Sequence, residues 1–159
     1  MNDIVSESEF ALSMQLERNT VEKLTVILQQ EQDALVEGED DRLETFAFDK
    51  TELLRHLAGL AEKRNRHLAS RGLIPDREGM EAWLADNADA KILAAWRDSL
   101  RFAKTAQQIN QTNGEMLVMR QQHNQQALAV LLGAADASAL YGPKGLTSRF
   151  SGRRPLGQV

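Results

Sequence analysis

The sequence has no cysteine among its 159 residues, and this absence excludes several kinds of site. Without thiols, the chain forms no disulfide, no thiolate metal site and no cysteine nucleophile. Long apolar runs are also missing: the longest, residues 127–135, is interrupted by Gly133 and is far too short to cross a bilayer. The first residues are acidic, whereas a signal peptide begins with positive charge. We therefore expect a cytoplasmic protein with no membrane insertion.

Patterns typical of catalysis are absent as well. There are three histidines, His56, His67 and His123, and only Glu52 and His56 have metal-ligand spacing, with no second pair to complete a site. The sequence contains neither a nucleophile-elbow motif nor a glycine loop that could cradle phosphates. Most acidic clusters fall where helix ends and turns are expected, which favours capping and solubility over acid–base chemistry. We expect no enzyme activity, no metal and no cofactor.

The charge is unevenly distributed along the chain. The net charge is −4, but residues 134–159 hold four cations against one anion and carry +3, which leaves −7 on residues 1–133. A nucleic-acid-binding domain needs clustered lysine and arginine on a folded face, so an acidic body argues against nucleic acid as a partner.

What the sequence does contain is long stretches of good helix formers, separated by glycine and proline. They predict an all-α fold with helices over about 3–37, 41–70, 76–86 and 88–133, in which the first two form a long antiparallel hairpin and the short one caps an end of it. Gly38 and Gly72 are expected to end the first two helices, and Asp41 to cap the second. Residues 1–133 would form the helical body and residues 134–159, which cannot build a core, a flexible basic tail.

The first helix has a seam that follows alternating steps of four and three residues, typical of a coiled-coil or bundle helix. Glu17 and Glu31 occupy two of its eight positions, and the other six are apolar: Phe10, Met14, Val21, Leu24, Leu28 and Leu35. A charge on an apolar seam indicates either the edge of the stripe, a cross-helix ion pair, or a device that selects the register of the hairpin. The second helix has a similar seam, which also includes Lys50 and Arg64.

The third long helix has apolar ends and a polar middle. Ten amide side chains lie between residues 107 and 126: Gln107, Gln108, Asn110, Gln111, Asn113, Gln121, Gln122, Asn124, Gln125 and Gln126. Buried amides would cost stability but fix register, which is the interpretation we favour; exposed amides would keep the helix soluble until a partner binds.

One pattern in the second half resembles a known family. The segment Asn110-Gln-Thr-Asn113-Gly114-Glu-Met-Leu117 is followed by an apolar stretch to Leu132 and then by Tyr141-Gly142-Pro143-Lys-Gly145. This combination, behind an N-terminal helical hairpin, is similar to the FlgN family of flagellar type III export chaperones. The resemblance covers almost the whole chain, except that residues 73–90 match nothing identifiable in the family. It gives Asn110, Asn113, Gly114, Gly142 and Gly145 a structural role.

The resemblance implies a carrier without turnover. Members of the family bind the C-terminal helical segments of the hook-filament junction proteins, prevent their premature association and deliver them to the export gate. Tyr141 is then the candidate contact for the stalk component of the export ATPase. The implied cargo-binding residues are all apolar and lie near the C-terminus: Leu128, Leu131, Leu132, Leu140, Leu146 and Phe150. The alternative function is a generic coiled-coil scaffold or oligomerisation module.

Overall fold

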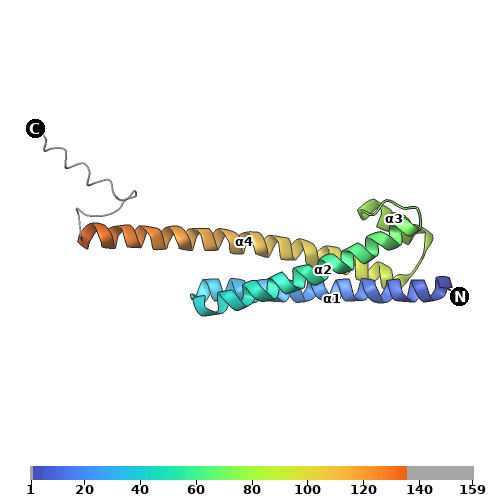
Figure 1. Ribbon diagram of the computed structural model, residues 1–159, viewed down its shortest axis with the longest axis horizontal. Coiled ribbons are helices and arrows are strands. Elements are labelled where there is room, and N and C mark those ends of the chain that lie inside the picture. Colours follow the sequence, from blue (N-terminus) through green and yellow to red (C-terminus); the bar gives the residue numbers. More distant parts are fainter. Residues whose placement is uncertain (1, 136–159) are drawn as a thin grey trace, which may run out of the picture. The chain divides into compact units, whose positions relative to one another are not determined.

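The computed structural model describes residues 2–135, and it describes burial for residues 7–133. Every element in this range is a helix, as predicted, so the all-α class is confirmed (Figure 1). In chain order the elements are α1 (Asn2–Glu37), a single 3-10 turn η1 (Asp40–Arg42), α2 (Leu43–Ser70), α3 (Arg77–Asp86) and α4 (Ala90–Ala135).

The chain divides into two packing units. Residues 1–113 pack together as one compact unit that contains α1, α2, α3 and the first half of α4, and the second unit begins at Gly114. Its described part, residues 114–135, is the second half of α4. The predicted boundary after Gly133 and the flexibility of the tail stay predictions, because residues 136–159 lie outside the described range.

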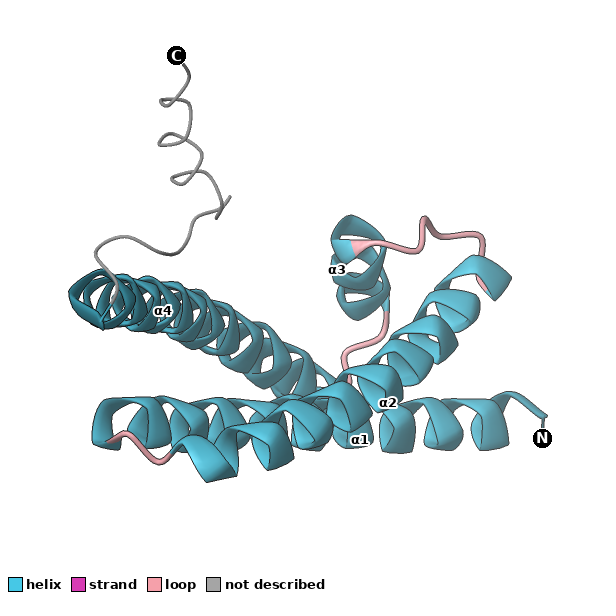
Figure 2. Ribbon diagram, turned by 60° about the vertical axis from the view of Figure 1, so that its left-hand side comes forward, coloured by secondary structure: helices cyan, strands magenta, loops and turns pink. Residues whose placement is uncertain are grey.

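Helices α1 and α2 form the expected antiparallel hairpin, in which α2 returns along α1 (Figures 1 and 2). Gly38 ends α1 with a φ of 79°, and the Glu39 amide donates to the Ala34 carbonyl at 2.9 Å. This is the left-handed cap that glycine accepts without strain. The predicted side-chain cap by Asp41 is wrong: residues 40–42 form the 3-10 turn, and α2 starts without a side-chain cap.

The seam of α1 is buried at all eight predicted positions, including Glu17 and Glu31. Its first two residues, Phe10 and Met14, belong to a core cluster that gathers side chains from all four helices, and Leu24 and Leu28 belong to a second, smaller cluster. The first cluster is completed by Leu68, Met80, Trp83, Ile92, Ala95 and Trp96.

Helix α3 covers one end of the hairpin, as the sequence predicted. The Asp76 carboxylate caps it by accepting from the Gly79 amide at 2.8 Å. The helix approaches the preceding loop so closely that a Cβ on Gly79 would lie 1.7 Å from the Ile74 carbonyl oxygen. Met80 and Trp83 are thereby placed in the first core cluster, where they are 0% and 4% exposed.

Helix α4 begins at Ala90 because the Asp89 side chain accepts from the Lys91 and Ile92 amides, at 2.9 and 3.0 Å. The indole of Trp96 donates to the Glu81 carboxylate of α3 at 3.2 Å. Ala106 joins the second core cluster with Leu24 and Leu28 of α1. These contacts hold the first half of α4 in the same unit as the hairpin.

Candidate functional site

Two ion pairs cross the interior of the hairpin. Glu17 pairs with Arg64, and Glu31 pairs with Lys50 at 2.8 Å, with the two glutamate side chains only 6% and 4% exposed. The two glutamates lie fourteen positions apart on α1, and their two partners lie fourteen positions apart on α2. The sequence left three hypotheses open for Glu17 and Glu31, and the structure shows a cross-helix ion pair at each of them. One register satisfies both pairs at once, and a slipped hairpin would leave buried charges without partners.

Asn113 extends the Glu31 pair to the third long helix. Its side-chain nitrogen donates to the Glu31 carboxylate at 2.8 Å and to the Leu28 carbonyl at 2.9 Å, and the residue is 1% exposed. Asn113 thus links α4 to α1 through a buried polar contact.

The other predicted motif residues in this region are exposed. Asn110 faces a groove, and a Cβ on Gly114 would meet nothing within 4 Å. The remaining eight amides of the polar middle are also exposed, so the register-fixing interpretation holds at Asn113 alone. Because these amides are exposed, they agree with the interpretation that they keep the helix soluble.

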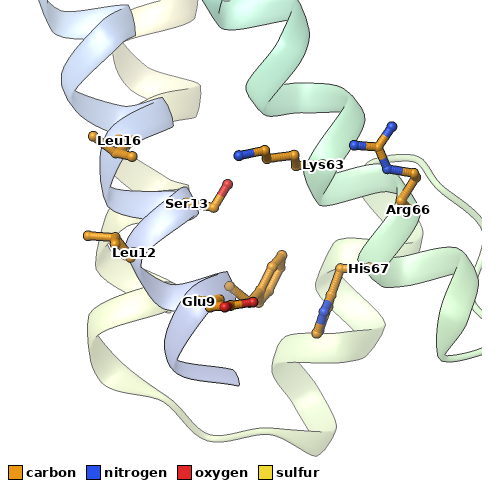
Figure 3. A pocket seen from close by; sticks show the side chains of 8 residues that line it. Glu9, Leu12, Ser13, Leu16, Lys63, Arg66 and His67 are labelled. Carbon is orange, nitrogen blue, oxygen red and sulfur yellow. The ribbon is translucent and has the colours of Figure 1, made fainter. Parts of the chain in front are cut away.

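An aromatic cluster lies beside a pocket between α1 and α2. Phe10 stacks on the His67 ring at 3.8 Å between ring centroids, and Trp83 meets both rings edge-on. Burial lowers the pKa of His67 from its ordinary 6.5; Arg71 lowers it further, while Glu7 opposes the shift. Figure 3 shows the pocket, with Glu9, Leu12, Ser13 and Leu16 on one helix and Lys63, Arg66 and His67 on the other.

A larger groove opens between α2 and α4 over α1, inside the first unit. Its volume is about 960 Å³, and its floor is the α1 seam at Val21, Leu24 and Leu28. Leu54 and Leu57 form the α2 wall, and residues from Leu100 to Asn110 form the α4 wall. Sequence reasoning missed this groove, because it depends on how far α2 and α4 stand apart above α1.

The second half of α4 exposes most of its apolar side chains. Three of the predicted cargo-binding residues are here: Leu128, Leu131 and Leu132 are 56%, 63% and 43% exposed. Fourteen large apolar side chains are exposed in the described structure, and seven of them fall within residues 117–132. This concentration marks the segment as a candidate partner-binding surface.

The remaining predicted site residues lie outside the described range. They are the cargo-binding candidates Leu140, Leu146 and Phe150, the export-machinery candidate Tyr141, and the motif glycines Gly142 and Gly145. Their roles stay predictions.

Metal-binding clusters and membrane-spanning helices are both absent from the described part of the chain. Over residues 2–135, no group of three or more histidine or acidic side chains is placed to hold a metal ion. No helix in that same stretch has the length and apolar character needed to cross a membrane.

Comparison with known proteins gives one match. The family model described as FlgN protein matches residues 1–149, which is most of the chain. Neither the curated proteins nor the solved structures contain a match. The family match extends over both packing units and includes the stretch from residue 73 to 90 that the motif comparison left unmatched.

Proposed function

Because the chain belongs to the FlgN family of flagellar export chaperones, we propose that its cargoes are the hook-filament junction proteins. In this proposal the chaperone binds their C-terminal helical segments in the cytoplasm, prevents premature association and delivers them to the export gate. It carries cargo without turning over a substrate.

The observation that supports cargo binding is the exposed apolar surface of residues 117–132. Leu128, Leu131 and Leu132 follow the i, i+3, i+4 spacing of residues that pack against a partner helix. Fully burying one leucine is worth about 1.5–3 kcal/mol. Because these three are already 43–63% exposed, covering them recovers a large share of that amount for each side chain.

The tail completes the proposed binding surface. Leu140, Leu146 and Phe150 supply further apolar contacts to cargo, and Tyr141 contacts the stalk component of the export ATPase. A segment that becomes ordered on binding loses conformational entropy, which moderates affinity and permits release. Release at the export gate is what a delivery chaperone requires.

Calorimetric titration tests the cargo assignment directly. The protein is titrated with each junction protein, and with versions of each that lack the C-terminal segment. We expect a dissociation constant below about 1 μM, equivalent to roughly −8 kcal/mol, for the complete proteins only. Equal affinity for the shortened cargoes would contradict the proposed recognition of C-terminal segments.

A matched pair of variants tests whether cargo contacts residues 117–132. Leu131→Asp puts a charge into the proposed surface and should weaken cargo binding about tenfold or more. Leu12→Asp makes the same change at a side chain that is likewise 63% exposed but lies on α1, and should leave the affinity unchanged. Identical affinities for the two variants would remove residues 117–132 from the cargo site.

The second candidate function is a coiled-coil scaffold. The same exposed apolar surface favours it, since a second copy of the chain could cover residues 117–132 instead of a cargo helix. Sedimentation velocity separates the two: a stable oligomer with no affinity for junction proteins supports the scaffold, and a monomer that binds them supports the chaperone.

A further inference from the structure

We propose that the groove between α2 and α4 is a second docking site, which takes an amphipathic cargo helix whose polar edge carries carboxylates. This inference rests on the proposed function, because the occupant is a segment of a junction protein. The groove lies within residues 1–113, whereas the proposed leucine contacts lie in residues 117–132.

The lining of the groove fits the apolar face of a helix. The floor, Val21, Leu24 and Leu28 of α1, is already buried, so the apolar surface that an incoming helix would cover is on the walls, such as Leu54 of α2, which is 51% exposed. Three helices that surround an open, apolar channel leave the fourth position of a four-helix bundle vacant, and a helix from a partner can occupy it.

The dimensions define the length of the occupant. On α4 the lining runs from Leu100 to Asn110, which spans roughly 15 Å at 1.5 Å per residue. A helix of about three turns fills this span. Isolated helices shorter than about 12–15 residues are marginal in water, so the cargo segment gains helical order as it docks.

The charge of the lining indicates what the polar edge of the occupant carries. Arg77, Arg101 and Lys104 line the groove, and none of the described residues that line it is a carboxylate, although residues 1–133 carry a net −7. Arg101 already donates to Asp98 at 2.9 Å, so part of its charge is compensated. Arg77 and Lys104 make no ion pair with any residue in the described part of the chain.

These cations act on an occupant at contact distance. Charges farther apart than about 8–10 Å are screened at physiological ionic strength. The acidic body as a whole therefore repels an acidic segment less than the local cations attract it.

The same charges argue against occupants from the chain itself. The tail, residues 134–159, carries +3 and would bring cations to a cationic rim. Residues 114–133 contain one glutamate and one arginine, so this segment of a second copy brings no net charge. An acidic amphipathic helix from another protein satisfies both the apolar floor and the cationic wall.

Site-specific cross-linking tests the occupant. Because the chain has no cysteine, one introduced cysteine is the only position that a maleimide photo-cross-linker labels. We expect a probe at Ala103→Cys, in the groove, to cross-link a junction protein at a helical segment with an acidic edge. A probe at Phe48→Cys, which is 66% exposed and outside the groove lining, should not.

The other outcomes separate this inference from the proposed function. If a probe at Val130→Cys cross-links cargo and the Ala103→Cys probe does not, the groove proposal fails and the chaperone function stands. Cross-links from Ala103→Cys to a second copy, or to residues 134–159 of the same chain, would overturn the assigned occupant. No cargo binding by calorimetry and no cross-link at any position would overturn both.

A charge reversal tests the cationic wall independently. Lys104→Glu should weaken cargo binding roughly tenfold, because an acidic edge then meets a carboxylate. Lys91→Glu makes the same change on the same helix, outside the groove lining, and should have no effect. Equal affinities for both variants, with helical content unchanged by circular dichroism, would contradict the charge assignment.

Discussion

Removing Lys50 while leaving Glu31 in place should destabilise the protein strongly. Glu31 is 3% exposed and holds the Lys50 ammonium at 2.8 Å, and its remaining side-chain hydrogen bond comes from Asn113. Removing one partner of a buried ion pair lowers the free energy of unfolding by about 3–5 kcal/mol, because the remaining charge stays desolvated. Since the Lys50 side chain is 20% exposed, we expect the lower end of this range for Lys50→Met. That loss corresponds to a fall in Tm of roughly 6–12 °C for a chain of this size.

The assay is urea unfolding at pH 7, followed by circular dichroism, with Arg55→Met as the matched control. Arg55 is on the same helix and pairs with Glu52, but its side chain is 70% exposed, so its loss should cost less than about 1 kcal/mol. The double variant Glu31→Met/Lys50→Met should recover most of the stability, because no buried charge is left. If Lys50→Met costs no more than Arg55→Met, or if the double variant is less stable than Lys50→Met, then the unpaired buried charge of Glu31 is not the main source of the loss.

Four further predictions concern other parts of the chain. Gly79→Ala should destabilise the protein by more than about 2 kcal/mol, because the added carbon would overlap the Ile74 carbonyl. Gly59→Ala, in the open middle of α2, should stabilise it by about 0.5–1 kcal/mol in the same denaturation assay. Because the folded-state pKa of His67 lies below 6.5, the folded chain binds fewer protons than the unfolded chain. Stability should therefore fall as the pH drops through 6.5 toward the folded-state value, and His67→Gln should show a flatter pH profile in urea titrations. Truncation after Gly133 should leave thermal unfolding unchanged yet weaken cargo binding about tenfold by calorimetry, and equal affinity would exclude a role for the tail.

The sequence predicted the helices and the buried face of α1 well, because both follow from local periodicity. All eight seam positions are buried, and both predicted stop glycines adopt positive φ. The start of α2 was predicted wrongly because Asp41 suits a cap as well as a 3-10 turn, and the choice depends on how the chain leaves Gly38.

The candidate site was harder to predict from the sequence than the helices were, because it depends on contacts between helices. The sequence placed Glu17 and Glu31 on one seam and Lys50 and Arg64 on another, and equal spacing on the two helices was the signal that could have paired them. Periodicity did not distinguish Asn113, which is buried, from the exposed amides around it, and only the family resemblance gave Asn113 a structural role, which it also gave to the exposed Asn110. The groove between α2 and α4 is set by interhelical distance, for which sequence periodicity gives no measure.

The two cross-helix ion pairs also restrict how the length of this chain can change during evolution. A residue inserted between Glu17 and Glu31 would turn the following part of α1 by about 100° and move one glutamate off the seam, away from its partner on α2. Insertions and deletions between the two ion pairs must therefore come as whole heptads in both helices at once, which are rare events. Residues 114–133 carry no such constraint, so we expect length differences among related chains to accumulate there and in the turn at residues 38–42 rather than inside the paired segments.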